Sequence, residues 1–493
     1  MLALAVALVL FAILAAVGAY RFWSTPKGPA TAAEVRSLAV LPFKPLVNTS
    51  GDEVLEMGMA DTLITKLSSI GEIAVRPVVA VRNYKDPGQN PASIGRELGV
   101  DAVLDGSIQH VGDRVRVTVR LVRVSDGKQL WSSKFDQKFD DIFAVQDSIS
   151  EDVAGELALK ITSQERELLA KRYTVDPEAY ELYLKGSFFW NKRTREGTRR
   201  AIEYFQQALD RDPNYAQAYV GIADCYQVMP IMGDVPSKEA FPKAKEAALK
   251  ALDIDPRLAE AHAAAGYIKF FFDWDWEGSR KDYQRALQLD PNSPRAHWGF
   301  AILLSSLGQH KEALAEVDQA LRLDPLSLLV GALKGQFLFH ARRFPESADT
   351  LHKTLEVDPS FWIAQINLGK TYQAEGRAEE AIEAFRKAGE LSGGVTEAIS
   401  LASYTYAVSG QRGEAERMLR ELKAASEKSY VPPYNLAMVY NGLGNSAETM
   451  KWLEKAYEEK DVHMVFLGVD PKWDKLRSDP GFASLMKRMN FPR

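Results

Sequence analysis

Residues 362–393 read WIAQINLGKTYQAEGRAEEAIEAFRKAGELSG, and this stretch decides the fold. Its spacing is typical of two short antiparallel helices joined by a tight turn. Gly369 and Ala381 are small because the two helices approach each other there. Tyr372 and Phe385 are expected to fill the space between neighbouring hairpins. The full pattern consists of Leu368, Gly369, Tyr372, Gly376, Ala381, Phe385 and Ala388.

Further copies of this unit are marked by a recurring Asp-Pro pair. The pairs are Asp176-Pro177, Asp212-Pro213, Asp255-Pro256, Asp290-Pro291, Asp324-Pro325 and Asp358-Pro359. Successive prolines lie 36, 43, 35, 34 and 34 residues apart. Proline ends one helix and fits the first turn of the next, so it separates the units. The pattern resembles the tetratricopeptide (TPR) repeat, and it predicts that residues 177–460 form an all-α TPR superhelix of about eight repeats.

Two segments depart from the regular repeat. Residues 228–242, VMPIMGDVPSKEAFP, lengthen the second interval, and their Pro and Gly content predicts an exposed loop between two helices. Residues 461–493 follow the last unit and are predicted to cap the superhelix. A cap is needed because a terminal repeat otherwise exposes its apolar face.

The concave face of the array is the predicted site for a partner. In TPR arrays the first helix of each unit lines this face. The corresponding positions hold Arg295, Trp298, Gln336, His340, Lys370, Gln373 and Asn441. One aromatic side chain among several hydrogen-bonding groups suits a protein or peptide segment. These residues do not reproduce the Lys/Asn array of TPR domains that clamp a terminal carboxylate.

Composition narrows the possible functions. The chain has 493 residues, enough for two or more domains, and its formal net charge of −5 argues against a nucleic-acid binder. Its single cysteine, Cys225, excludes an intrachain disulfide framework. The seven histidines are scattered and form no zinc-binding motif. The sequence therefore predicts a protein that is not an enzyme and that has no metal or cofactor.

The N-terminus reads as a membrane anchor. Residues 1–20 carry no charge, and a helix of that length spans about 30 Å, the thickness of a bilayer core. Residues 1–23 are predicted to be a single transmembrane helix, and residues 24–35 a linker. The alternative is a cleaved signal peptide with a small-residue site at residues 17–19, although a basic segment ahead of the apolar run is missing.

Residues 36–165 read as a compact α/β domain. The expected strands lie at 37–43, 72–77, 101–110, 113–124 and 128–136, and the expected helices at 52–70, 91–98 and 142–157. In the strand at 113–124, apolar residues alternate with Arg114, Arg116 and Arg120. These arginines could meet an anionic partner, or they could simply form the solvated face of a half-exposed strand.

This domain resembles a known family. The segments AVLPF (39–43), ADTLITKLSSI (60–70), IGRELGVDAVLDGS (94–107), GDRVRVTVRLV (112–122) and IFAVQDSI (142–149) are similar to the TolB-N/FlgO-like domain. Together with the TPR array, the resemblance implies an envelope-anchored bacterial TPR protein. Relatives often carry an effector, such as a winged-helix domain or a kinase, ahead of the membrane segment, and we expect none in this chain.

The resemblance also implies a membrane orientation and a function. It favours a bacterial inner-membrane protein with a periplasmic body, whereas Arg21, Lys27 and Arg36 favour a cytoplasmic body by the positive-inside rule. We predict a non-enzymatic scaffold that binds protein partners through the TPR concave face. The alternative is a sensor, in which the α/β domain binds a small envelope molecule and the TPR array signals to a separate effector.

Overall fold

The structure is a computed structural model that describes residues 35–492, apart from 46–51, 83, 85–87, 158, 160, 193 and 234. The predicted anchor at 1–23, and all but the last residue of the predicted linker at 24–35, lie outside the described residues. Within the described ranges, no helix has both the length and the apolar composition needed to cross a bilayer.

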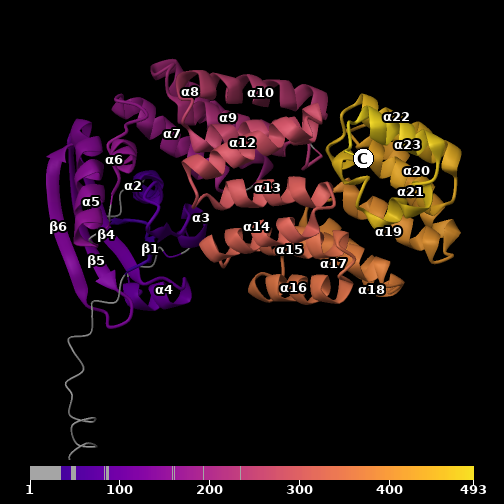
Figure 1. Ribbon diagram of the computed structural model, residues 1–493, viewed down its shortest axis with the longest axis horizontal. Coiled ribbons are helices and arrows are strands. Elements are labelled where there is room, and N and C mark those ends of the chain that lie inside the picture. Colours follow the sequence, from indigo (N-terminus) through magenta and orange to yellow (C-terminus); the bar gives the residue numbers. More distant parts are fainter. Residues whose placement is uncertain are drawn as a thin grey trace, which may run out of the picture.

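The N-terminal domain is built on a mixed sheet (Figure 1). The strand order is β3-β1-β4-β5-β6, and β2 also pairs with β4. Strand β1 runs parallel to β3 and β4, whereas β4, β5 and β6 form an antiparallel meander. The strands are β1 (Ser37–Val40), β2 (Lys44–Pro45), β3 (Ala74–Val75), β4 (Ala102–Val111), β5 (Arg114–Arg123) and β6 (Gln129–Lys138). The predicted α/β class of this domain is confirmed.

Helices bury one face of the sheet. The apolar residues of β5 point into the same core as the apolar stripes of α2 and α5, because alternate strand residues face opposite sides. Helix α2 in turn packs against α7, the first helix of the repeats. The helices of this part are α2 (Asp52–Ser68), α3 (Val78–Val81), α4 (Pro91–Glu97), α5 (Ile142–Glu156) and α6 (Ser163–Leu169).

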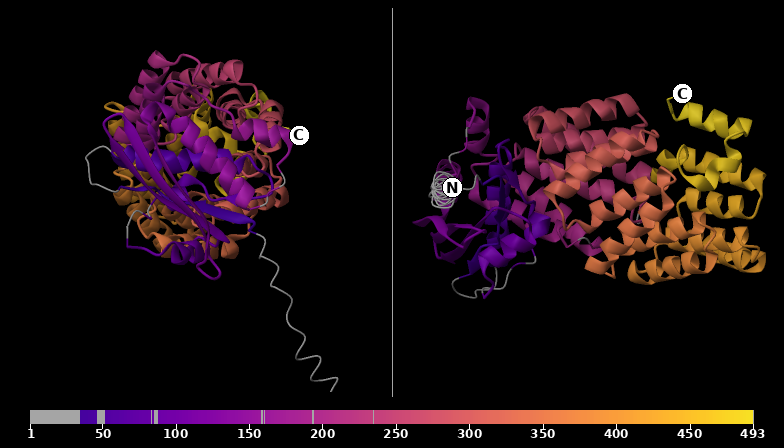
Figure 2. Two further views of the ribbon diagram at one scale, coloured as in Figure 1. Left: turned by 90° about the vertical axis from the view of Figure 1, so that its left-hand side faces the viewer. Right: turned by 60° about the horizontal axis from the view of Figure 1, so that its bottom comes forward.

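In the described residues, the helices from α7 to α22 pair into eight antiparallel hairpins that stack on one another (Figure 2). The pairs are α7 (Pro177–Trp190) with α8 (Arg195–Arg211), α9 (Ala216–Val228) with α10 (Ser237–Ile254), α11 (Ala259–Ile268) with α12 (Trp276–Leu289), α13 (Pro294–Ser306) with α14 (His310–Leu323), α15 (Leu328–His340) with α16 (Phe344–Val357), α17 (Trp362–Ala374) with α18 (Ala378–Leu391), α19 (Thr396–Val408) with α20 (Arg412–Ser426), and α21 (Pro433–Gly442) with α22 (Ser446–Glu458). The predicted TPR array is confirmed.

The Asp-Pro pairs explain where the helices end. Asp212, Asp255 and Asp290 each follow a second helix of a hairpin and have an extended backbone. Each carboxylate accepts a hydrogen bond from the backbone N–H two residues further on. This local turn competes with continuation of the helix, and the proline that follows the aspartate prevents the helix from continuing.

The predicted loop at 228–242 is only partly a loop. Helix α10 already begins at Ser237, and Phe241 is fully buried. The Phe241 ring stacks on Phe272 with 5.3 Å between ring centroids. The prediction of an exposed loop is therefore wrong for residues 237–242, because the Pro- and Gly-rich composition hid an aromatic core residue.

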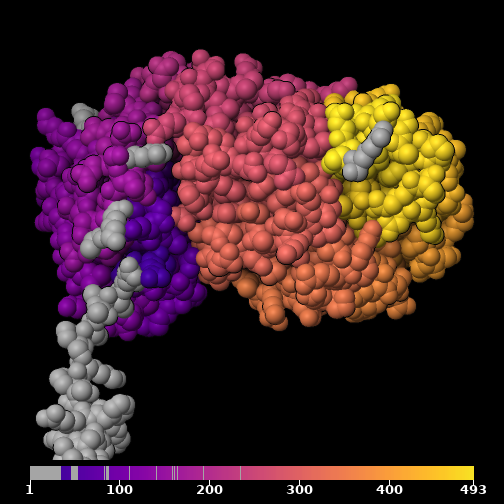
Figure 3. All heavy atoms as spheres, viewed as in Figure 1, coloured from indigo at the N-terminus to yellow at the C-terminus, as the bar shows by residue number. Residues whose placement is uncertain are grey.

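The C-terminal residues pack against a distant hairpin. They form η3 (Val462–Phe466), η4 (Pro471–Leu476) and α23 (Pro480–Arg488). The Trp276 indole Nε1 donates to the Met489 carbonyl at 2.9 Å, and the π-helical turn η2 (Lys269–Asp273) contacts η3. Figure 3 shows these residues, in yellow, lying against the middle repeats. The array therefore curves until its third hairpin meets the end of the chain.

Candidate functional site

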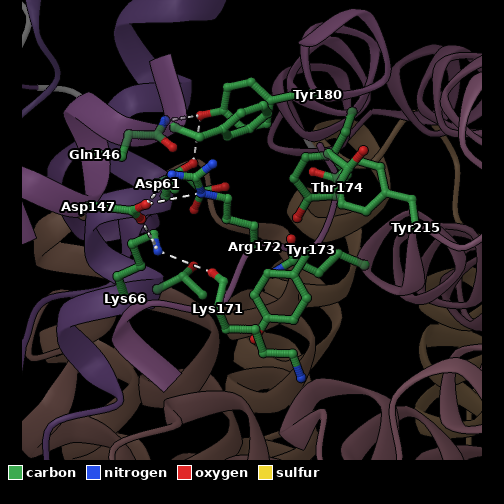
Figure 4. A pocket seen from close by; sticks show the side chains of 15 residues that line it. Asp61, Lys66, Gln146, Asp147, Lys171, Arg172, Tyr173, Thr174, Tyr180 and Tyr215 are labelled. Carbon is green, nitrogen blue, oxygen red and sulfur yellow. Dashed lines mark hydrogen bonds and ion pairs between the residues drawn. The ribbon is translucent and has the colours of Figure 1, made fainter. Parts of the chain in front are cut away.

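A cavity lies where the α/β domain meets the repeats (Figure 4). Its walls come from α2 and α5 on one side, α7 and α9 on the other, and the connecting residues 171–174. Its volume is about 40 Å³, room for a few water molecules or one small group. It is lined by Asp61, Thr62, Thr65, Lys66, Phe143, Gln146, Asp147, Lys171, Arg172, Tyr173, Thr174, Tyr180, Tyr183, Tyr215 and Gln217.

The cationic groups of this cavity are already paired. The buried Lys66 Nζ donates to Asp147 Oδ1 at 2.9 Å and also to two backbone carbonyls. Arg172 donates to the other oxygen of Asp147 at 2.7 Å. Lys171 forms an ion pair with Asp255 of the repeats. Each of these cations thus lies against a carboxylate, and the Lys171–Asp255 pair joins the connecting segment to the repeats.

Tyr180 joins the two domains through its hydroxyl. It accepts a hydrogen bond from Gln146 Nε2 at 2.6 Å and lies 2.7 Å from the Thr62 hydroxyl. The Tyr180 ring contacts Phe143 edge-on, with 5.2 Å between centroids. Burial raises the pKa of Tyr180, so its hydroxyl is neutral and able to donate.

Asp61 lacks such partners. Within the described part of the chain, its carboxylate on α2 makes no hydrogen bond and no ion pair. Burial and the nearby Glu260 carboxylate raise the pKa of Asp61 to about 6. The Tyr183 and Tyr215 rings contact each other at a tilt of 42° beside this region, with 5.0 Å between ring centroids, and Tyr215 is only 1% exposed. The cavity thus combines an uncompensated carboxylate with aromatic walls.

Two of the predicted concave-face residues contact the C-terminal segment. His340 is 3% exposed, lies 3.0 Å from the Ser305 hydroxyl through Nδ1, and contacts the Phe466 ring. Asn441 Nδ2 donates to the Lys472 carbonyl at 2.6 Å. These contacts bind the chain to its own end.

Lys370 belongs to a polar network that reaches the C-terminal segment. Its Nζ lies 2.7 Å from Glu397, and Glu397 lies 3.8 Å from His463 of the C-terminal segment. Arg295 lies apart from this network and forms an ion pair with Asp224 on α9. The predicted positions thus lie on α13, α15, α17 and α21, and several of them already have partners within the chain.

Trp298, Gln336 and Gln373 are the predicted positions whose side chains are not engaged by a polar partner within the described residues. They lie on α13, α15 and α17, the first helices of three successive hairpins, and each is half-buried. In the described residues their side chains form no hydrogen bond. We call these three residues the inner ladder. Partner binding there stays a prediction.

The arginines of β5 have carboxylate partners across the sheet. Arg114 and Arg116 each lie 2.7 Å from Asp136 on β6, and Arg120 lies 2.7 Å from Asp105 on β4. These contacts fit the alternative of a solvated strand face, and an anionic partner stays a prediction. In the described residues, no group of three or more His, Cys, Asp or Glu side chains could hold a metal ion.

Sequence reasoning did not find the interdomain cavity. Its residues come from positions 61 to 217, and only the packing of α2 against α7 brings them together. One local signal existed: Tyr173, Tyr180 and Tyr183 cluster at the domain boundary. Clustered tyrosines at a boundary favour an interface that is apolar yet able to form hydrogen bonds.

Comparison with known families agrees with this architecture. Residues 34–152 match the family described as the HilA/YgeH-like transcriptional regulator, second domain. Residues 189–226, 275–337, 333–394 and 434–462 match tetratricopeptide repeat families. The chain is a TPR protein with a HilA/YgeH-like N-terminal domain. The TolB-N/FlgO-like assignment of that domain stays a prediction.

Two curated relatives match more than half of the chain. A putative adenylate cyclase 3 from Rhizobium meliloti is 30% identical over 289 residues, covering 56% of this chain and 41% of the relative. The transcriptional regulator HilA from Salmonella typhimurium is 25% identical over 311 residues, covering 62% of this chain and 54% of HilA. The chain thus spans about half the length of these relatives.

A solved TPR structure is similar to part of this chain. The crystal structure of YrrB, titled as a TPR protein with an unusual peptide-binding site, is 22% identical to this chain. It covers 38% of this chain and 93% of its own, with a TM-score of 0.27.

Proposed function

We propose that this protein is a non-enzymatic adaptor that binds a protein or peptide segment along the inner ladder. The observation that carries the proposal is the row formed by Trp298, Gln336 and Gln373 on successive first helices. An indole flanked by two unpaired amides offers an apolar anchor and hydrogen bonds to an extended segment.

The adaptor function is tested with ladder variants in a pull-down from the native host. Gln336→Lys and Gln373→Lys place charge on the ladder without breaking an ion pair, and we expect partner recovery to fall at least about tenfold. Glu379→Lys, at an exposed position of α18, is the matched control. Equal recovery with all three variants would remove the ladder from the proposal. Charge reversal at Arg295 or Lys370 is less informative, because each holds an internal ion pair.

We further propose that residues 1–23 anchor the protein in a bacterial inner membrane, with the body on the periplasmic side. The uncharged run of 20 residues supports the anchor, and the resemblance to envelope-anchored relatives supports the orientation. A C-terminal reporter that is active only outside the cytoplasm tests the orientation. A silent reporter, together with a bright cytoplasmic reporter at the same position, would reverse it.

A second candidate function is a ligand sensor. The specific observation in its favour is the cavity at the junction, because both domains contribute its walls. A molecule bound there would favour the docked arrangement over any other arrangement of the two domains. One relative is a transcriptional regulator, and residues 34–152 match the family of its second domain, which supports a signalling role upstream of a separate effector.

A further inference from the structure

The electrostatics of the interdomain cavity are unbalanced. Lys66 and Arg172 share the single carboxylate of Asp147, and Lys171 pairs with Asp255, so each cation beside the cavity lies against a carboxylate. Asp61 has no cation of its own in the described residues. A carboxylate that is held away from bulk water without a partner is costly, and an arriving cation would lower that cost.

The aromatic walls add a second preference for positive charge. The Tyr183 and Tyr215 rings are tilted against each other, and Tyr173 lines the same space from the connecting segment. The Lys171 ammonium already lies 5.1 Å from the centroid of the Tyr173 ring. The negative face of a tyrosine ring attracts an ammonium or guanidinium group. The hydroxyl of the buried Tyr215 also lacks a hydrogen-bond partner in the described residues, so it can accept one from an N–H group.

We propose that this cavity binds the positively charged nitrogen group of a small organic cation, a primary ammonium or a guanidinium. Asp61 is the counter-ion, and Tyr173, Tyr183 and Tyr215 form the walls. The inference rests on the second proposed function, the sensor, and names the chemical class of its ligand. A volume of about 40 Å³ fits the charged head of such a molecule, with any longer tail directed outward.

Other ligand classes fit less well. An anion would have to compete with Asp147 and Asp255 for the cations that these carboxylates already hold. A neutral molecule would leave Asp61 without a counter-ion. Since α2 and α5 belong to one domain and α7 and α9 to the other, a bound cation contacts both domains and strengthens their docking.

The test uses the full chain with ethylammonium and methylguanidinium as probes. Acetamide and acetate serve as neutral and anionic probes of similar size, and sodium chloride keeps the ionic strength constant. We expect the two cations to raise the unfolding midpoint in a concentration-dependent way, and to give a saturable signal by titration calorimetry at pH 7.5. Acetamide and acetate should leave both measurements unchanged.

Two variants locate the binding. Asp61→Asn keeps the side-chain shape and removes the charge, so cation affinity should fall about tenfold or more. Its unfolding midpoint without ligand should not fall, because the variant also removes the repulsion between Asp61 and Glu260. Asp152→Asn, at an exposed position of α5, is the matched control and should bind as the native chain does.

The outcomes separate this inference from the sensor function. If acetate or acetamide binds and the cations do not, the proposed ligand class is wrong and the sensor function stands. If no probe binds, the inference fails, and the sensor function loses the cavity on which it rests. If the cations bind Asp61→Asn as tightly as the native chain, the assigned counter-ion is wrong. None of these results bears on the inner ladder, which the pull-down tests separately.

Discussion

At the scale of the residue, close approach of an aromatic ring to a glycine holds the hairpins together. A Cβ added at Gly369 would lie 2.5 Å from the Phe385 ring, and one added at Gly186 would lie 2.5 Å from the Phe205 ring. Both rings are almost fully buried. Such packing tolerates no additional methyl group unless the helices move apart.

This packing predicts opposite effects for two Gly→Ala substitutions. Gly369→Ala should lower the free energy of unfolding by about 1–3 kcal/mol, because the methyl group overlaps the Phe385 ring. Gly413→Ala, in a helix of the same array with open space around it, should raise it by about 0.4–1 kcal/mol. Urea unfolding followed by circular dichroism measures both. Equal effects would mean that helix propensity alone governs these positions.

At the scale of the element, the C-terminal segment is fixed to the array by a polar network around His463. Its Nδ1 lies 3.0 Å from Asp461, its Nε2 lies 3.8 Å from Glu397 on α19, and its ring stacks on Tyr434 of α21. Burial alone would lower the pKa of His463, but the two carboxylates outweigh it and raise the pKa to about 9. The imidazole therefore carries a positive charge at neutral pH.

The raised pKa predicts how stability depends on pH. A group whose pKa is higher in the folded chain stabilises it fully below the unfolded value near 6.5, and this stabilisation is lost as pH rises through about 9. The loss should be on the order of 2–3 kcal/mol between pH 6.5 and 9. His463→Gln should flatten the dependence of the free energy of unfolding on pH across this window, whereas His262→Gln should leave that dependence as it is in the native chain. If His463→Gln keeps the pH dependence of stability that the native chain shows, a group other than His463 is responsible for it.

The elements differ in how well the sequence predicts them. The hairpins and the strands β4, β5 and β6 follow from local periodicity, since their apolar patterns are complete within one or two elements. The cap at 461–493 was predicted, but its contacts were not. Trp276 and Met489 are 213 positions apart, and no local pattern reports which surfaces meet at that distance.

The same limit applies to the candidate sites. The concave positions follow from the repeat, so they could be named in advance. That His340 is buried against Phe466 could not be foreseen, because it depends on where the chain end folds back. Asp61 gave no sequence signal of its own, because its isolation depends on the docking of α2 against the repeats.

At the scale of the whole molecule, the α/β domain is docked on several turns of the array. Asn292 Nδ2 donates to the Ile73 carbonyl at 3.2 Å, and Lys171 pairs with Asp255. Arg76 makes the most extensive contact: its guanidinium donates to the carbonyls of Arg322 and Leu323 at 2.7 and 2.9 Å. The aspartates that end the repeats thus lie beside the interface between the two domains. The docking of the α/β domain therefore depends on the relative positions of successive repeats.

Arg76 is therefore predicted to control the docking of the two domains. It is 5% exposed and also donates to the carbonyls of Leu98 and Gly99, so Arg76→Met leaves four acceptors without their donor. We expect a loss of about 2–4 kcal/mol in the free energy of unfolding and faster hydrogen exchange near residues 320–326. Arg96→Met, at an exposed position of α4, should change neither measurement. Unchanged exchange in Arg76→Met, with both domains folded, would mean that the remaining contacts hold the domains together.

In that case the interdomain cavity would persist without this arginine, and cation binding at Asp61 should be unaffected. If the domains separate instead, cation binding should be lost in Arg76→Met although Asp61 itself is intact.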